Sequence, residues 1–170
     1  MKKNLFVFLT ALLLLPVMLK AQNDIIIGTD DVASSRPFCG IYANSWCETV
    51  YPADEIATAG NITALAWACS HVNPQVYSHL RIYLGTKTAD TYVSSSDWTP
   101  MSELTLVYDA TNITVGAAAS WQTFTLDNPF FYDGSENLVV VVAKTMSHSS
   151  PTDFYYTSVS NTCLYRDNGS

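Results

Sequence analysis

The chain has 170 residues, of which 48% are hydrophobic and 14% charged, and its formal net charge is −7. This length fits one domain with enough apolar residues to bury a core, and it leaves little room for a second domain. The negative charge argues against nucleic acid and anionic membrane surfaces as partners, because both would repel the protein.

The N-terminus has the pattern of a secretory signal peptide. Lys2 and Lys3 form a basic start, and the apolar stretch Leu5–Leu19 follows them. A membrane-spanning helix needs roughly 20 apolar residues, which this stretch does not reach. Ala21 offers the small side chain that a cleavage site needs. The sequence therefore predicts a signal peptide over residues 1–21.

Cleavage would leave residues 22–170 as the mature protein. We expect this part to be a single domain that is secreted or held at the cell surface and does not span the membrane. Cleavage removes three of the 8 basic groups and none of the 15 acidic ones, so the mature formal charge is −10. That charge makes nucleic acid a still poorer partner.

Most of the mature chain is predicted to form short strands. Polar and apolar residues alternate with a period of two in several segments, which is typical of strands with one buried face. The run Leu138–Ala143 is apolar throughout, which indicates a strand buried on both faces. In chain order, the expected strands are 25–27, 38–42, 48–51, 62–68, 80–84, 104–108, 123–126, 138–143, 154–157 and 163–166.

Turn-forming residues separate these strands, and helical segments are almost absent. One helical turn is expected at Pro52–Ile56, where Pro takes a first helical position and acidic residues follow it. About nine or ten short strands at this spacing predict an all-β fold, a two-sheet antiparallel β-sandwich with jelly-roll-like connections.

Four cysteines, Cys39, Cys47, Cys69 and Cys163, lie in the mature part of the chain. An even number of cysteines in an exported protein predicts two disulfides, with three pairings open. We favour Cys39 with Cys47, facing each other across a hairpin, which leaves Cys69 with Cys163. The spacings lack the close cysteine pairs of a zinc site.

Catalytic residues are not expected. The histidines His71, His79 and His148 have neither metal-ligand nor catalytic-triad spacing, and Ser94–Ser96 lack the frame of a nucleophilic serine. We therefore predict a protein that is not an enzyme and has no organic cofactor.

Calcium is the one cofactor that the acidic turns suggest, because this cation prefers several oxygen ligands. The candidate ligands are Asp30 and Asp31 beside a strand end, and Asp133 and Glu136 around a turn. The alternative is that these acids are solvated turn residues without a metal.

Aromatic residues near loops are the candidates for ligand binding, because a sugar can stack its apolar C–H face on an aromatic ring. The candidates are Trp98, Tyr92, Trp121, Tyr155 and Tyr156, with Trp98 expected to be the most exposed tryptophan. The alternative is that these rings cover hydrophobic edges.

Several segments together resemble a family of secreted bacterial modules. They are Tyr51–Ile56, Gly60–Leu65, Leu80–Thr88, Ser96–Trp98, Leu104–Tyr108, Trp121–Phe130 and Tyr132–Leu138. The family consists of β-sandwich modules in large secreted and surface proteins of anaerobic Gram-negative bacteria from gut and mouth, including the adhesin domains attached to gingipain-type proteases. The resemblance covers roughly residues 45–166.

The resemblance implies the fold more strongly than a function, because such modules mostly lack an assigned ligand. In this family the module usually precedes fibronectin-type repeats and a sorting domain, whereas this chain stops at Ser170. The family also has Asp-Trp at the position of Trp98, which implies a tryptophan that plugs a loop.

Two functions follow as expectations. The first is a non-catalytic extracellular binding module, of the adhesin or carbohydrate-binding type, whose partner is a glycan or a surface protein. The alternative is a structural spacer or an assembly subunit of a surface protein or filament, which would use an unpaired edge strand to join its neighbours.

Overall fold

The computed structural model describes residues 23–29, 32–38, 42–146 and 152–168, and within them the fold is all-β. The strands are β1 Val32–Ser34, β2 Asn44–Tyr51, β3 Gly60–Ala68, β4 Gln75–Lys87, β5 Thr105–Val115, β6 Trp121–Tyr132, β7 Asn137–Thr145, β8 Phe154–Tyr156 and β9 Cys163–Asn168. The helix α1 spans Ala53–Ile56, and a 3₁₀ turn spans Met101–Glu103. The expected signal peptide lies outside the described residues.

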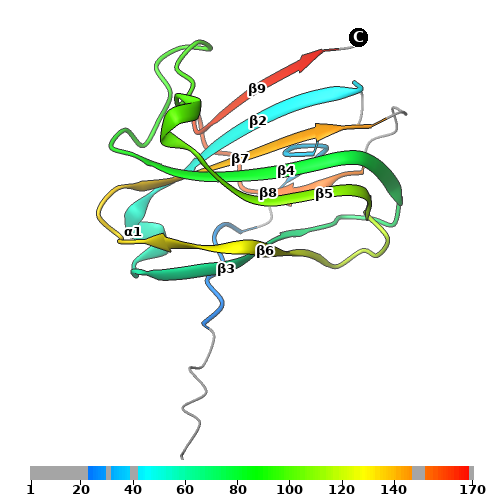
Figure 1. Ribbon diagram of the computed structural model, residues 1–170, viewed down its shortest axis with the longest axis horizontal. Coiled ribbons are helices and arrows are strands. Elements are labelled where there is room, and N and C mark those ends of the chain that lie inside the picture. Colours follow the sequence, from blue (N-terminus) through cyan, green and yellow to red (C-terminus); the bar gives the residue numbers. More distant parts are fainter. Residues whose placement is uncertain (1–22, 30–31, 39–41, 147–151, 169–170) are drawn as a thin grey trace, which may run out of the picture.

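The strands form two layers (Figure 1). One layer is a five-stranded antiparallel sheet in the order β5-β4-β7-β2-β9, which we call the large sheet. The other layer contains the pairs β3–β6 and β1–β8, which meet at a bridge between Cys69 and Phe154, and we call it the small sheet. The predicted all-β, antiparallel fold is confirmed.

The inner core lies between the two sheets, and aromatic rings fill its centre. The ring of Phe38 lies 4.7 Å from that of Phe154, 5.1 Å from that of Trp67 and 5.4 Å from that of Phe124. Phe38 comes from the segment between β1 and β2, and the other three rings come from the small sheet. Their contacts therefore hold distant parts of the chain together. Offset and edge-to-face arrangements such as these add to the free energy of burial.

A second core lies on the outer side of the large sheet, and we call it the outer core. It contains Val50, Tyr83, Tyr92, Val139, Val141, Ala143 and Leu164, with Trp46, Trp98 and Leu104 packed against them. Strand β7 therefore sends Leu138, Val140 and Val142 into the inner core and the alternate residues into the outer core. The predicted strand with two buried faces is confirmed.

Several strands are longer than the sequence pattern indicated, and the added parts include inner-core residues such as Tyr77, Val115 and Tyr132. Strand β4 begins at Gln75, strand β5 continues through Thr111–Val115, and strand β6 continues to Tyr132. The segment Ile25–Ile27, expected as a strand, has no regular structure. The single helical turn after Pro52 is confirmed.

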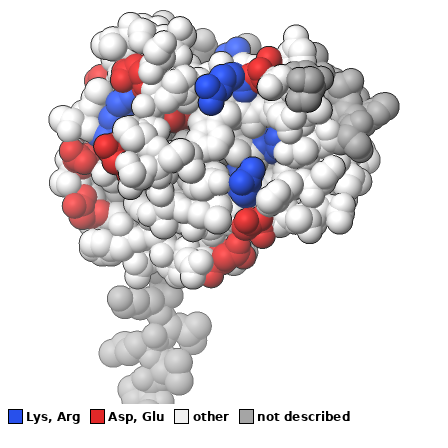
Figure 2. Space-filling model, turned by 45° about the horizontal axis from the view of Figure 1, so that its top comes forward, with Lys and Arg blue, Asp and Glu red and all other residues white. Residues whose placement is uncertain are grey.

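No helix among the residues that the structure describes is long and apolar enough to span a membrane. On the face drawn in Figure 2, Lys and Arg side chains are scattered among Asp and Glu, with large uncharged areas between them. The described part of this face therefore has no extended basic patch.

Candidate functional site

The segment that joins β4 to β5, residues 88–104, folds back over the outer side of the large sheet. It contributes Tyr92, Trp98 and Leu104 to the outer core. We call the surface beneath it the covered face. Two of the five aromatic residues predicted to bind a ligand therefore lie in a covering loop that packs onto the sheet.

Tyr92 is held in place by a buried carboxylate. Its side chain is only 4% exposed, and its hydroxyl donates a hydrogen bond of 3.0 Å to Glu48 Oε1. Burial is the larger cause and the charge of Glu48 the smaller cause that raise the pKa of Tyr92. The hydroxyl therefore stays neutral and keeps the proton that it donates to Glu48. The expectation that Tyr92 stacks on a ligand is wrong, because the ring is inside the protein.

Glu48 has no exposed surface and accepts hydrogen bonds from two residues of the covering loop. Besides the bond from Tyr92, it accepts one of 3.0 Å from the Thr99 amide and one of 2.6 Å from the Thr99 hydroxyl. A buried carboxylate needs such donors to replace the water that it has lost. Glu48 thus fixes the loop to strand β2.

Trp98, like Tyr92, packs onto the large sheet. It is half-buried against the outer core, and the Arg166 guanidinium lies 5.4 Å from the centre of its ring. Trp98 is therefore not the exposed tryptophan that the sequence suggested. Its packing agrees with the loop plug that the resemblance implied.

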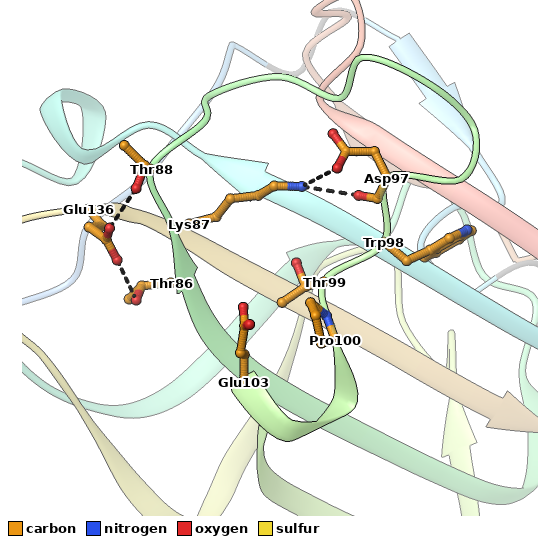
Figure 3. Close-up of a pocket in the computed structure, with 9 residues that line it drawn as sticks. All are labelled: Thr86, Lys87, Thr88, Asp97, Trp98, Thr99, Pro100, Glu103 and Glu136. Atoms are coloured by element: carbon orange, nitrogen blue, oxygen red, sulfur yellow. Dashed lines mark hydrogen bonds and ion pairs between the residues drawn. The ribbon is translucent and has the colours of Figure 1, made fainter.

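A polar hollow of about 250 Å³ opens beside this loop (Figure 3). Lys87 Nζ donates to the Asp97 carbonyl at 3.0 Å and lies 3.5 Å from its carboxylate. Glu136 accepts hydrogen bonds from the hydroxyls of Thr86 and Thr88 at 3.0 and 2.7 Å. Lys87 is thus paired with Asp97, and Glu136 with two threonines, and the ring of Trp98 points away from them.

Of the predicted calcium ligands, the described pair Asp133 and Glu136 bond to different neighbours. Asp133 accepts hydrogen bonds from the amide and the hydroxyl of Ser135, at 2.8 and 2.7 Å, and these bonds lower the pKa of its carboxyl. Glu136 instead faces Thr86 and Thr88, whereas Asp30 and Asp31 lie outside the described residues. Within the described ranges, no three side chains of the types His, Cys, Asp and Glu form a group that could hold a metal ion.

The described histidines make local polar contacts. His79 Nε2 lies 2.5 Å from Asp109 Oδ1, on neighbouring strands, and His71 Nδ1 lies 3.0 Å from the Ser70 hydroxyl. His148 lies outside the described residues. Both contacts are at the surface. Neither places the described histidine between a nucleophile and a residue that orients the ring.

The outer side of the small sheet differs from the covered face. Ala68 is paired with Trp121 of β6, and the bridge between Cys69 and Phe154 places Ala68 next to Tyr155 of β8. Residues opposite each other in antiparallel strands project to the same side. Since Cys69 and Phe154 are buried in the inner core, the side chains of Trp121, Ala68 and Tyr155 project outward.

This outward row consists of two aromatic residues with a small residue between them. Trp121 is 50% exposed and Tyr155 is 40% exposed. Each lies one strand away from Ala68, so about 10 Å of sheet separates the two backbones. The methyl group of Ala68 is too small to cover the inner edge of either ring.

Small and hydroxyl-bearing residues continue this surface along the strands. Ala66 is paired with Thr123, and Ala64 with Thr125. We call the surface formed by Ala64, Ala66, Ala68, Trp121, Thr123, Thr125 and Tyr155 the open face. None of these residues is charged.

The fifth aromatic candidate, Tyr156, is 41% exposed but alternates with Tyr155 along β8, so it projects to the other side. The structure therefore brings Trp121 and Tyr155 onto one surface and separates them from Tyr92, Trp98 and Tyr156. Sequence reasoning missed Ala64, Ala66 and Ala68. Their alternation with Leu65 and Trp67 is the signal that could have identified the open face.

The cysteines have a different arrangement from the favoured one. Cys47 Sγ lies 3.4 Å from Cys163 Sγ, and the three described cysteines are free thiols. Cys69 belongs to the small sheet and packs in the inner core. The expected pairing of Cys69 with Cys163 is wrong, because Cys163 lies beside Cys47 instead. Cys39, the expected partner of Cys47, lies outside the described residues.

Comparison with known proteins gave no relative: no family model, no curated protein and no solved structure matches this chain.

Proposed function

We propose that this protein is a non-catalytic extracellular binding module, of the adhesin or carbohydrate-binding type, that binds a glycan on its open face. The observation that carries the proposal is the outward row in which Trp121 and Tyr155 flank Ala68. Two exposed rings on a rigid sheet offer stacking surfaces for the apolar faces of two sugar units of one chain.

The surroundings of the rings support a neutral glycan. The open face has no charged residue, so it lacks the groups that would recognise an ionised ligand. The hydroxyls of Thr123 and Thr125 belong to residues that are exposed beside the rings, and each can both donate to and accept from a sugar hydroxyl. The formal charge, −7 for the whole chain and −10 after cleavage of residues 1–21, would also repel acidic sugars.

The proposal includes location outside the cell or on its surface. The signal-peptide pattern over residues 1–21 and the resemblance to secreted adhesin modules support it. A surface protein that carries a suitable glycan would be bound in the same way. Calcium is not required by this binding mode, and its effect is measured in the experiment below.

The experiment is a glycan array probed with the purified protein, with and without calcium, followed by titration of any glycan that binds. For a sugar stacked on one ring we take the value of about 0.5–1.5 kcal/mol that a pair of aromatic rings contributes beyond its buried area. We therefore expect Trp121→Ala and Tyr155→Ala each to weaken binding about 2- to 10-fold.

The matched control is Phe131→Ala, because Phe131 is a 68% exposed aromatic at the opposite end of the same strand. It should leave the affinity unchanged. If Trp121→Ala and Tyr155→Ala bind as tightly as the unaltered protein, the site is elsewhere. If the unaltered protein binds no glycan on the array, the binding proposal fails.

The alternative, a spacer or assembly subunit, is favoured by the position of β9 at the edge of the large sheet. An edge strand can pair with a strand from another molecule. Arg166 and Asp167 place charges along this edge, and charged edges oppose such pairing. Concentration-dependent assembly in solution, with no glycan bound, would support this alternative.

A further inference from the structure

The neighbouring strands β2 and β9 bring two cysteines together. Thr49 is paired with Cys163, and Cys47 with Tyr165, so the two cysteines form a diagonal pair on adjacent strands. Cys47 and Thr49 alternate with Glu48 and Val50, which face the covered face and the outer core. The two thiols therefore lie on the inner side of the large sheet.

The side chains already point toward each other. The two Sγ atoms are 3.4 Å apart, which is the distance of a thiol hydrogen bond. A disulfide requires about 2.05 Å between the sulfurs, so small rotations about the side-chain bonds bring the atoms into bonding distance. The backbone pairing of β2 and β9 needs no change of register for this step.

The two thiols have different chemical character. Cys163 is only partly buried, and hydrogen bonds from Cys47 and Thr49, together with the positive charge of Arg36, lower its pKa. Cys47 is fully buried, and its hydrogen bond to Cys163 and its burial raise its pKa. Cys163 is thus the thiolate that can attack an incoming disulfide. Cys47 is the thiol that reacts with Cys163 in the second step.

We propose that Cys47 and Cys163 form a disulfide when the protein enters an oxidising compartment, and that this bond fixes the edge strand β9 to β2. The oxidant is a disulfide donor, either a thiol oxidase or a small-molecule disulfide. The pairing differs from both bonds that the sequence favoured.

The reaction is a balanced thiol–disulfide exchange. The Cys163 thiolate attacks one sulfur of the donor, the donor bond breaks, and the leaving sulfur takes the electron pair and a proton. Cys47 then loses its proton and attacks Cys163 Sγ, which displaces the second donor sulfur as a thiol. Two cysteine thiols are oxidised, and the donor disulfide is reduced to two thiols.

The bond would close a loop that spans 116 positions of the sequence. A cross-link over so long a loop restricts the unfolded chain strongly. It would also hold β9 in place, since this edge strand pairs with β2 alone among the described strands. We expect reduction to lower the melting temperature by roughly 10 °C.

The test is a peptide map of the full-length gene product, exported to a bacterial periplasm, alkylated and digested without reductant. Chymotrypsin is the suitable protease, because aromatic residues separate all four cysteines. Trypsin would leave Cys39, Cys47 and Cys69 in one peptide that ends at Arg81. The expected result is a peptide pair that joins Cys47 to Cys163 and separates after reduction.

Variants then test the consequence for stability. Cys47→Ser, Cys163→Ser and the double variant should melt at the same reduced temperature, because each removes the same bond. Cys69→Ser is the control and should keep the cross-linked peptide. A map that joins Cys163 to Cys69 or Cys39, or that finds Cys47 and Cys163 alkylated, overturns the proposal even if no variant folds.

Discussion

The two sheets bury their inner sides in the same core, but the outer side of one is covered and the outer side of the other is exposed. The outer side of the large sheet is closed by residues 88–104, with Tyr92 and Trp98 packed into a second core. The outer side of the small sheet leaves Trp121 and Tyr155 exposed on regular strands. Among the five aromatic candidates, the two in the covering loop pack onto the large sheet, whereas the three on strands are at least 40% exposed.

The largest expected difference between the two faces is in stability after removal of a tryptophan. Trp98→Ala should lower the free energy of unfolding by about 2–3 kcal/mol, because it opens a cavity under the covering loop. Trp121→Ala should change it by no more than about 0.5 kcal/mol, since the ring is at the surface.

Urea denaturation of both variants measures this difference, and circular dichroism shows whether they fold. Equal losses in the two variants would mean that Trp121 is also a packing residue. The division into a covered and an open face would then be wrong.

A smaller effect is expected from removal of one hydroxyl on each face. Tyr92→Phe should cost about 1–2 kcal/mol of stability, because the buried Glu48 carboxylate loses one donor but keeps those of Thr99. Tyr155→Phe should cost almost nothing, because water replaces any bond that its exposed hydroxyl makes. Thermal melts of the two variants provide the comparison, and a stable Tyr92→Phe variant would show that Glu48 does not depend on Tyr92.

The smallest effect is expected at the turn of Asp133, outside both faces. Hydrogen bonds from Ser135 lower the pKa of this carboxyl below its ordinary value of 3.8, so they stabilise the charged form in the folded state. This stability is present above the ordinary pKa and is lost as the pH falls through the lowered one. Asp133→Ala should therefore melt slightly earlier at pH 7 and no earlier at a pH below the lowered pKa. A difference between the two proteins that does not change with pH would assign the effect to the turn backbone.

The sequence predicted the parts of the fold that depend on local pattern. The run Leu138–Ala143 could be identified as buried on both faces because every residue in it is apolar, and β7 meets a core on each side. The positions of Trp98 and Tyr92 could not be predicted from periodicity, because residues 88–104 fold back onto a strand more than 30 positions away in the chain.

The site depends on similar long-range contacts. Trp121 and Tyr155 were predicted as aromatics near loops, but their placement on one surface depends on the pairing of β6 with β3 and on the bridge between Cys69 and Phe154. Glu48 gave no sign of its role, because its donors come from the covering loop. The cysteine pairing could not be predicted either, since four cysteines permit three arrangements and only the strand order distinguishes them.

The strand order of the large sheet also determines when this sheet can be completed during synthesis. Strand β2 lies early in the chain, yet its only partners in the described structure are β7 and β9, which lie near the end. A chain emerging from the ribosome or crossing a membrane with its N-terminus first has no described partner for β2 until β7, more than 80 positions later, is released. Sheets built from such distant segments assemble slowly. The large sheet can therefore be completed only after β9 has emerged.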